Sequence, residues 1–550
     1  MTVVVIRKSE VKKIVGNKND QEIDHVLSMM STAVEKFDNE KELIEVEVAP
    51  NRPDMLSEQG ILRALKTFTG KEKGLHKIEV VKSGYKLIIE KSLPKDYPYG
   101  ISCVVKGLKF DDEKIKEVID IQEKLGATLL RKRKKGGIGL YPLEKISFPI
   151  KLVGMKPEDI KFRPLEFPRE LNGRQILSQH PTGREYGHLL EGWDRYPVFI
   201  DAKKVIMSMP PIINSHDVGK INENTKDIFV EATGTDYNLL KKLMNIIIFS
   251  LVDMGGKVYS MECVQSDGKK ENIPDFTPGK KKLNIENANK LLGLKLKESD
   301  VAKLLGKMGI DYNKGNALVP AYRTDILHEV DLIEDIAIAY GYDNLIPSIP
   351  EVSSIGEISK KELIKNKISE SLSGLGLIET SSYHLTTKDY QINRSGLKSN
   401  DENKFIEVEN SKTEYSILRK DLSHYLLKIL GENVDVEYPQ EIFQTGTIFG
   451  RKNDLKEEDS LSIALAPGNF TRLKQIFEYL GRMLDLKFEI SKTDNFEPYF
   501  IEGRVAEAKF NGKSLGYFGE VHPKILKNFK IKMPVALLEI NLEELFKVLT

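Results

Sequence analysis

Carboxylate side chains gather along a helix predicted over residues 329–340. Three of them are spaced i, i+3 and i+4, which places them on one face of the helix, and a fourth lies shortly before it. The four residues are Asp325, Asp331, Glu334 and Asp335. Hard oxygen ligands with room for water suit magnesium, and a cation would offset their mutual repulsion. The same spacing also fits an acidic face open to solvent, or salt bridges to the nearby Arg323 and His328.

A second group of polar side chains surrounds two predicted turns. The first turn holds the prolines of SMPPIINS, residues 208–215, and the second is EATGTD, residues 231–236. The polar members are Ser208, Asn214, Glu231, Thr233, Thr235 and Asp236. Gly234 lets the backbone approach a neighbour closely, and polar sets of this kind line small-molecule pockets. Two ordinary turns at strand ends would account for the same residues.

A third feature is a run of five positive charges followed by two glycines. The run consists of Arg131, Lys132, Arg133, Lys134 and Lys135, and Gly136-Gly137 follows. A flexible basic loop of this kind can hold the phosphate backbone of a nucleic acid. A loop that is simply exposed to solvent has the same composition, so both interpretations stay open.

The overall charge and the cysteine content limit the class of protein. Among 550 residues, 83 Lys and Arg face 82 Asp and Glu, which gives a formal net charge of +1. This balance argues against a histone-like nucleic-acid binder, although it permits a local basic patch. Two cysteines, Cys103 and Cys263, are too few for a disulfide scaffold and favour a reducing compartment.

The hydropathy pattern argues against a membrane protein. The most apolar stretch, residues 246–252 (IIIFSLV), is too short to cross a bilayer, and the first residues do not resemble a signal peptide. We therefore predict a cytoplasmic protein with no membrane contact. At roughly 150 residues per domain, the length predicts three to five domains.

Four predicted blocks of an α+β multidomain protein hold these residues. The blocks are an N-terminal α/β module at 1–75, a mixed α/β block at 84–268, a small α+β block with the acidic helix at 270–350, and a last block at 356–550. Long strands separated by helices predict a mainly antiparallel sheet in the last block. Pro347 and Pro350 mark a linker, and we expect no short-period internal repeat.

Five stretches, taken together and in order, resemble the β subunit of phenylalanine–tRNA ligase in its archaeal and eukaryotic form. They are EVEVAPNRPDMLSEQGILRAL, HPTGREYGHLLEGWDRYP, SMPPIINS with EATGTD, YRTDILHEVDLIEDIAIAYGYDNLIP, and FIEGRVAEAKFNGKSLGYFGEVHP. They span most of the chain. We therefore expect the architecture and the division of labour of that family.

The resemblance implies an (αβ)2 heterotetramer. The α subunit would use ATP to attach phenylalanine to tRNA(Phe), while the β subunit would complete the assembly and edit misacylated tRNA. Residues 84–268 would form the editing domain, and residues 356–550 a degenerate, non-catalytic class II core. The resemblance also implies a magnesium site at positions matching Asp325, Asp331, Glu334 and Asp335.

The sequence of the last block fits a core without catalytic activity. A working class II site needs arginines on its sheet to neutralise the ATP phosphates. The predicted strand at 441–449, EIFQTGTIF, offers only Gln444 and threonines where such an arginine is expected. We therefore predict that this chain alone forms no adenylate.

Editing follows from the similarity of two amino acids. An apolar pocket rejects a substrate with one extra hydroxyl by only about 10²-fold, so a phenylalanine enzyme needs a second site that destroys Tyr-tRNA. Within the family's editing domain, we expect Glu231 to accept the phenol hydrogen bond. Ser208 and Thr233 would orient the ester or a water, and the loop Arg131–Lys135 would contact tRNA.

Two other functions compete with this interpretation. A stand-alone RNA-binding or scaffold protein would share the folds but lack a hydrolytic pocket, so deacylation of Tyr-tRNA separates the two. A free-standing metal-dependent hydrolase would use the acidic helix directly and would act without tRNA or a partner subunit.

Overall fold

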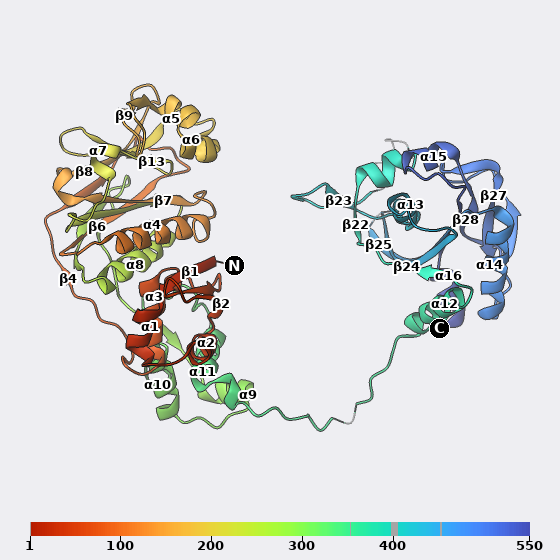
Figure 1. Ribbon diagram of the computed structural model, residues 1–550, viewed down its shortest axis with the longest axis horizontal. Coiled ribbons are helices and arrows are strands. Elements are labelled where there is room, and N and C mark those ends of the chain that lie inside the picture. Colours follow the sequence, from red (N-terminus) through yellow and green to blue (C-terminus); the bar gives the residue numbers. More distant parts are fainter. Residues whose placement is uncertain (1, 353, 398–404, 452–453) are drawn as a thin grey trace. The chain divides into compact units, whose positions relative to one another are not determined.

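The computed structural model describes residues 2–352, 354–397, 405–451 and 454–550 (Figure 1). The chain divides into two compact units, Met1–Ile349 and Pro350–Thr550. The first three predicted blocks lie in the first unit, and the last block forms the second. Within the described residues, none of the helices is both long enough and apolar enough to cross a membrane.

The N-terminal block is a three-stranded antiparallel sheet covered by helices. The strands β1 (Thr2–Arg7), β3 (Leu43–Val48) and β2 (Ala33–Asp38) are arranged in the order β1-β3-β2, and the helices are α1 (Lys8–Val15), α2 (Asp20–Met29) and α3 (Glu58–Phe68). Alternate residues of β3 are buried, because successive side chains of a strand point to opposite faces. Helix α3 begins after Ser57, whose Oγ accepts the backbone N–H of Gly60 at 3.1 Å.

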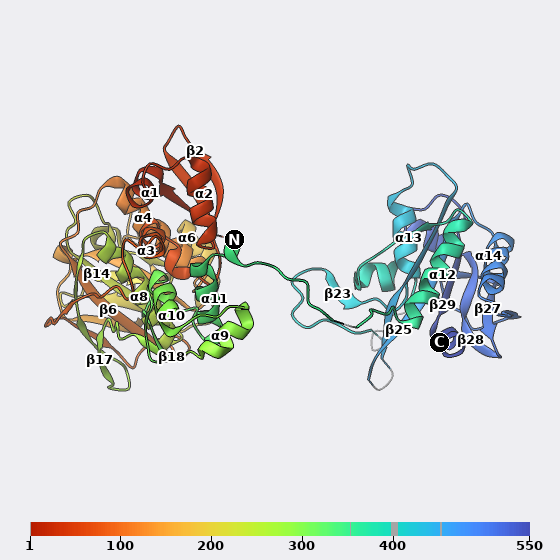
Figure 2. The ribbon, with the colours of Figure 1, turned by 90° about the horizontal axis from the view of Figure 1, so that it is seen from below.

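Two sheets form the mixed α/β block (Figure 2). The larger has the order β13 (Ile213–Asn214), β12 (Ile206–Met209), β11 (Tyr196–Ile200), β8 (Ile150–Met155), β5 (Lys86–Ile89), β16 (Met261–Val264) and β17 (Lys270–Ile273). The smaller has the order β4 (Val80–Val81), β15 (Lys257–Tyr259), β6 (Tyr99–Lys106), β14 (Ile228–Gly234) and β7 (Gly136–Pro142). Strand β14 is buried along its whole length, so its polar side chains lie inside the protein.

Several helices of this block contact strands of the smaller sheet. They are α4 (Asp112–Ala127), α5 (Gly173–Gln179), α6 (Pro181–Tyr186), α7 (His216–Gly219) and α8 (Tyr237–Asp253), and a short ribbon is formed by β9 (Lys161–Phe162) and β10 (Leu171–Asn172). Helix α8 contacts β6 and β14, and most of its residues are buried. The two cysteines, Cys103 on β6 and Cys263 on β16, are buried free thiols, as predicted.

The small third block carries the acidic helix. Strands β18 (Gly279–Lys282), β20 (Asn316–Val319) and β19 (Asp311–Asn313) form a sheet beside helices α9 (Ile285–Leu292), α10 (Glu298–Lys307) and α11 (Glu329–Tyr340). Helix α11 has the predicted bounds, since His328 accepts the Val330 N–H at its start and Gly341 ends it with φ of 95°.

The second unit is built on a seven-stranded sheet. Its order is β21 (Ile378–Glu379), β24 (Gln440–Arg451), β25 (Leu455–Ala466), β29 (Ala536–Asn541), β28 (Lys513–Val521), β27 (Phe500–Phe510) and β26 (Glu489–Lys492). All neighbouring pairs are antiparallel except β21 with β24, which confirms the predicted mainly antiparallel sheet.

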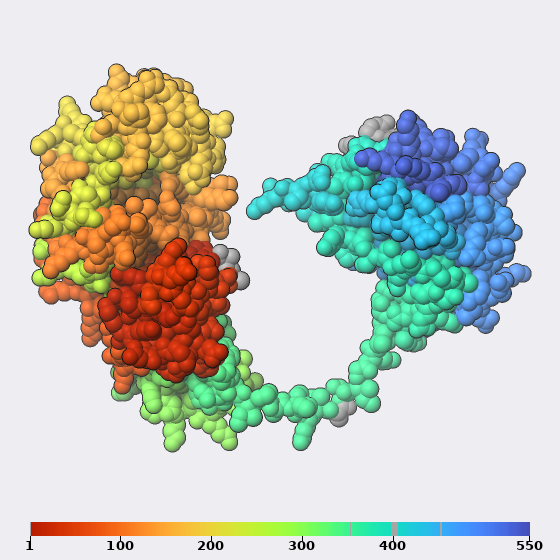
Figure 3. Space-filling model, viewed as in Figure 1, coloured from red at the N-terminus to blue at the C-terminus, as the bar shows by residue number. Residues whose placement is uncertain are grey.

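Apolar cores lie on both faces of this sheet. The helices are α12 (Lys360–Gly374), α13 (Ser423–Glu432), α14 (Phe470–Met483), α15 (Pro523–Asn528) and α16 (Glu543–Leu549), and a separate hairpin joins β22 (Leu385–Thr387) to β23 (Tyr415–Leu418). One core contains residues of α12, α14 and α16, and the other contains residues of α13 and α15. The space-filling view shows one face of the surface that these elements form (Figure 3).

Candidate functional site

A cavity of about 350 Å³ opens in the mixed α/β block. Its wall combines one face of α4, the start of β7, the Pro210–Pro211 turn and a buried carboxyl group, that of Glu231. Apolar side chains dominate the lining, with few polar groups among them. Cavities of this size and character receive small molecules or single groups of a larger substrate.

Strand pairing positions Glu231 at the cavity. On β14, Glu231 and Thr233 lie on one face, and they pair with Gly139 and Gly137 of β7. A Cβ at position 139 would overlap Glu231 Oε1 and lie 2.5 Å from the hydroxyl of Tyr141. The glycine at position 139 of β7 therefore leaves room for the Glu231 carboxyl group.

The Glu231 carboxyl group belongs to a short buried chain of hydrogen bonds. The Tyr141 hydroxyl lies 3.2 Å from Glu231 Oε1 and 3.1 Å from Asn214 Oδ1. Burial raises the pKa of Glu231 to about 8, against 4.5 for an ordinary glutamate. A neutral carboxyl group can donate to Tyr141, which then donates to Asn214, whereas two acceptors could not share the single phenol proton.

Several buried polar atoms near the cavity have no partner. They include Glu231 Oε2, Ser208 Oγ and Thr235 Oγ1. An unsatisfied buried oxygen costs about 1–3 kcal/mol, so such atoms are rare unless a ligand or water completes them. Of these residues Glu231 lines the cavity, so its Oε2 is an acceptor without a partner in the cavity wall.

The three residues predicted for editing lie close to one another in the fold. Glu231 lines the cavity. Ser208 is buried on β12, where it pairs with Asn214, a lining residue. Thr233 is also buried, and its Oγ1 lies 3.1 Å from the hydroxyl of Tyr97.

Sequence reasoning missed the tyrosines at positions 97 and 141. Burial raises the pKa of both phenols, with the Glu231 carboxyl adding to the effect at Tyr141. Their proximity to Glu231 and Thr233 depends on strand pairings between distant segments. The only local signal was the alternation of small residues in GGIGLYP, residues 136–142.

The basic loop adjoins the same cavity. Arg131, Lys132 and Arg133 all have positive φ, at 51°, 53° and 60°, so the loop turns tightly. Arg133 turns inward, where its Nη1 donates to the carbonyl of Ile212 at 3.0 Å and its guanidinium lies 4.4 Å from the ring centre of Tyr186. Arg131, Lys132 and Lys134 are exposed, while Lys135 is half-buried. Contact with tRNA stays a prediction for the exposed members.

The acidic helix does not gather its carboxylates around a common point. Within the described ranges, no group of three or more His, Cys, Asp or Glu side chains is arranged to hold a metal ion. Arg323 Nη2 lies 2.7 Å from Asp325 Oδ2 and 2.9 Å from Asp335 Oδ2, and all three side chains are buried. The arginine already forms an ion pair with each of these two carboxylates, as the salt-bridge alternative allowed.

The other two predicted ligands have different surroundings. Asp331 Oδ2 accepts the backbone N–H groups of Leu327 and His328 at 2.7 and 2.6 Å, so it caps the start of α11. Glu334 is exposed. The four residues as arranged here therefore do not fit a magnesium site. Two of them pair with an arginine, one caps the helix, and one faces solvent.

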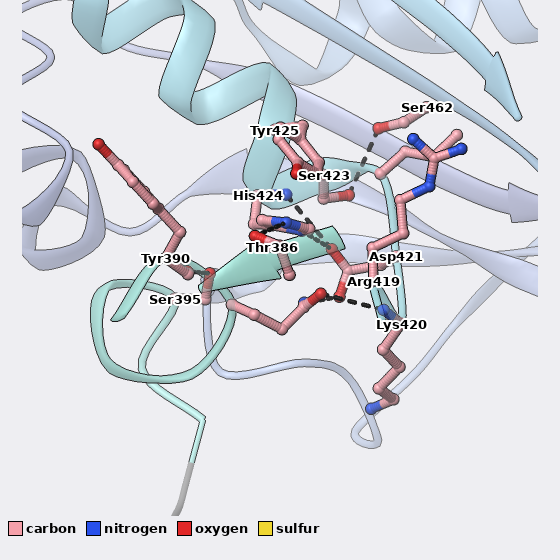
Figure 4. Close-up of polar contacts among 12 residues, drawn as sticks. Thr386, Tyr390, Ser395, Arg419, Lys420, Asp421, Ser423, His424, Tyr425 and Ser462 are labelled. Atoms are coloured by element: carbon pink, nitrogen blue, oxygen red, sulfur yellow. Dashed lines mark hydrogen bonds and ion pairs between the residues drawn. The ribbon is translucent and has the colours of Figure 1, made fainter. Parts of the chain in front are cut away.

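A buried arginine, Arg419, lies in the second unit beside β24, the strand that itself offers no arginine from 441 to 449 (Figure 4). Arg419 Nε donates to the carbonyl of Thr447 at 2.8 Å, and Nη1 donates to the carbonyl of Ser382 at 3.0 Å. Position 446 is a glycine because a Cβ there would lie 2.7 Å from Arg419 Nη2. Two of its three nitrogens, Nε and Nη1, thus donate to the protein itself.

Acidic groups lie beside that arginine. His424 joins Asp421 and Thr386, with Nδ1 3.0 Å from Asp421 Oδ1 and Nε2 3.0 Å from Thr386 Oγ1 (Figure 4). Burial alone would raise the pKa of Asp421, but the hydrogen bond from His424 holds it below its usual value. Burial and the Asp421 charge raise the pKa of Glu539 to about 7.

Comparison with known proteins places the chain in a family. Residues 281–342 match the family profile of the tRNA synthetase B5 domain, and residues 346–542 match that of the phenylalanyl tRNA synthetase beta chain CLM domain. A crystal structure of an N-terminal fragment of the phenylalanyl-tRNA synthetase β subunit from Pyrococcus horikoshii superimposes with a TM-score of 0.59 at 32% identity, covering 62% of this chain and 99% of that fragment.

Relatives that match nearly the whole chain belong to the same family as the profiles. The chain is 35% identical to the phenylalanine–tRNA ligase β subunit of Archaeoglobus fulgidus over 99% of both chains. It is also 35% identical to that of Pyrococcus furiosus over 90% of both chains. The fold and the matched domains are those of an aminoacyl-tRNA synthetase subunit. More narrowly, the chain belongs to the phenylalanine–tRNA ligase β-subunit family.

Proposed function

We propose that this chain is the β subunit of a phenylalanine–tRNA ligase. It acts in the cytoplasm with an α subunit, in an (αβ)2 heterotetramer that uses ATP to attach phenylalanine to tRNA(Phe). Membership of the β-subunit family supports this assignment. The aminoacylation site belongs to the α subunit.

The second unit contributes structure rather than adenylate chemistry. Arg419, the arginine buried beside β24, donates to backbone carbonyls, and Asp421 and Glu539 lie in the same interior. ATP would have to displace these contacts before its phosphates could use the arginine. Isolated β chain should therefore show no phenylalanine-dependent ATP–pyrophosphate exchange.

Editing of Tyr-tRNA(Phe) is the activity we propose for the chain itself. The observation that carries it is a buried carboxyl group in a cavity wall, with one oxygen lacking a partner. Because Oε1 of Glu231 pairs with Tyr141, Oε2 is left as an acceptor for the tyrosine phenol. Phenylalanine offers no donor and would leave that oxygen unsatisfied.

This arrangement favours tyrosine over phenylalanine by a large factor. A site built to hydrogen-bond a substrate hydroxyl rejects the analogue lacking it by about 10⁴–10⁵-fold. Thr233 lies on the same strand as Glu231, and Ser208 pairs on the larger sheet with Asn214, which accepts from the Tyr141 hydroxyl; we propose that Ser208 and Thr233 orient the ester or the attacking water. Arg133 closes one side of the cavity, while the exposed members of its loop contact the tRNA backbone.

Magnesium does not enter this proposal. The resemblance implied a site at the acidic helix, but metal binding there would require Asp325 and Asp335 to exchange Arg323 for the ion. The geometry favours the arginine, and no step of editing depends on a metal at that helix.

The decisive experiment compares Glu231→Ala with a matched variant in the complex. Glu117 on α4 is also a mostly buried glutamate, and burial raises its pKa to about 7, but it contacts Gln59 and does not line the cavity. Glu231→Ala should slow hydrolysis of Tyr-tRNA(Phe) by at least tenfold, and Glu117→Gln should not. Phenylalanylation should persist in both. Hydrolysis at the wild-type rate in Glu231→Ala would remove the proposed role.

A further inference from the structure

A second, much smaller cavity lies in the first unit, where the N-terminal block meets the small third block. Its volume is about 10 Å³, and it is lined by residues of α3 and the segment before it, and by residues at the end of α10 and before α11. The charged residues of the lining are Arg52, Asp54, Arg63, Lys307 and Arg323. Among the described residues that line this cavity, four are therefore cationic and one is a carboxylate.

The carboxylate of the wall is already bound by one of the arginines. Arg52 donates to Asp54 through Nε at 2.9 Å and Nη2 at 2.8 Å. Arg63 pairs with Asp253, which does not line the cavity, and its guanidinium lies 4.4 Å from the ring centre of Tyr322. These contacts hold the guanidinium groups in place and leave the wall with an excess of positive charge.

Arg323 brings a buried donor without a partner to this cavity. Its Nε lies 2.9 Å from Asp325 Oδ1, and its Nη2 lies 2.9 Å from Asp335 Oδ2. Neither of these carboxylates lines the cavity. Nη1 is buried and has no hydrogen-bond partner among the described residues. Buried donors are rarely left unpaired in native proteins, and an ordered ion or water normally completes them.

The chemistry of the wall favours an anion over a water. The nitrogens of arginine and lysine only donate hydrogen bonds, so they suit a ligand that accepts from every side and carries negative charge. The volume decides which anion can enter, because about 10 Å³ holds one water-sized particle. Phosphate, sulfate and carboxylates are too large, and chloride is the monatomic anion of ordinary solutions.

We propose that this cavity is a chloride site that fastens the N-terminal block to the third block. The ion accepts from Arg323 Nη1 and lies among the positive charges that line the cavity. Arg52 and Arg63 belong to one block, and Lys307 and Arg323 to the other. Chloride therefore stabilises the junction by relieving the repulsion between cations that come from both blocks. The inference does not depend on the editing activity.

The dependence of stability on chloride tests the site in the full chain. Urea unfolding of the first unit, followed through Trp193, is compared in sodium chloride and in sodium gluconate at equal ionic strength. Gluconate is too large for the cavity. A ligand that binds only the folded state raises stability as its concentration rises. The unfolding midpoint should be higher in chloride and rise with its concentration, and equal midpoints in the two salts would overturn the proposal.

Two variants and a control separate this site from a general salt effect. Ala64 on α3 lines the cavity, so Ala64→Leu fills it without removing a charge. Lys307→Gln removes a positive charge from the wall, whereas Lys303→Gln removes an exposed charge from the same helix outside the wall.

The difference in midpoint between the two salts should fall at least twofold in Ala64→Leu and in Lys307→Gln, and it should be unchanged in Lys303→Gln. If Ala64→Leu does not fold, the two lysine variants decide the question. A difference that is the same in Lys307→Gln, Lys303→Gln and the wild type would show a general salt effect and would overturn the proposal.

Crystals grown with bromide in place of chloride identify the ligand directly. Bromide carries the same charge, and it gives an anomalous scattering signal that water does not give. An anomalous peak should lie within hydrogen-bonding distance of Arg323 Nη1. Electron density at this place without an anomalous signal would identify a water molecule and would overturn the proposal.

Discussion

Arg323 holds Asp335 through both oxygens of the carboxylate, with Nη2 3.0 Å from Oδ1 and 2.9 Å from Oδ2. The same guanidinium reaches Asp325, so one buried cation serves two carboxylates. Arg52 with Asp54 forms a similar buried pair in the N-terminal block. Charges buried in this way are costly to separate.

Replacing Arg323 should therefore destabilise the first unit strongly. Arg323→Met would leave two buried carboxylates without the guanidinium that hydrogen-bonds them, at a cost of about 3–5 kcal/mol in the free energy of unfolding. Urea unfolding can be followed through Trp193, the only tryptophan of the chain, which lies in the first unit. Arg174→Met, which breaks an exposed pair with Glu158, should unfold like the wild type. A midpoint unchanged by Arg323→Met would show that the pair is not formed.

The same geometry predicts how magnesium affects stability. Asp331→Ala removes the cap of α11 and should cost about 1 kcal/mol whether or not magnesium is present. Glu334→Ala should have little effect. The shift in unfolding midpoint between chelator and excess magnesium should be equal in wild type and both variants. A shift that disappears in either variant would restore the sequence-based prediction of a metal site at this helix.

The raised pKa of Glu231 predicts a pH dependence of stability. Between pH 4.5 and about 8 the folded chain keeps a proton that the unfolded chain has lost. The contribution of Glu231 to the free energy of unfolding is therefore full below that range and falls with rising pH, by up to about 1.4 kcal/mol per pH unit. Glu231→Gln mimics the neutral acid and should remove this loss. Parallel stability curves for wild type and variant across this range would contradict the assignment.

Gly139→Ala should separate editing from aminoacylation. The added Cβ meets Glu231 Oε1 and the Tyr141 hydroxyl, so the carboxyl group must shift from its place in the cavity wall. Tyr-tRNA hydrolysis by the complex should fall at least tenfold, while phenylalanylation stays within twofold. A matched change is Gly107→Ala, whose Cβ has open space although its φ of 78° strains the turn. If both variants lose hydrolysis equally, the effect is general destabilisation.

Sequence patterns within a few residues predicted single helices and strands well. They could not predict which distant segments of the chain pair with one another. Helix α3 was predictable because Ser57 caps its start, but α2 was missed although Asn19 and Glu22 form a capping box there. The spacing of carboxylates on α11 was correct, yet spacing cannot tell whether an arginine or a metal neutralises them. That Tyr141 would reach Glu231 depended on the register of β7 against β14.

The exposed part of the basic loop should set the salt dependence of tRNA binding. Arg131, Lys132 and Lys134 are free of the cavity wall, so R131Q/K132Q/K134Q removes charge without opening the cavity. The slope of log Kd against log salt should decrease by about 0.7–0.9 for each phosphate that the loop no longer neutralises. The charge-preserving variant R131K/K132R/K134R should keep the wild-type slope, because the counterion effect depends on charge. An unchanged slope in the neutral variant would place the tRNA backbone elsewhere on the chain or on its partner.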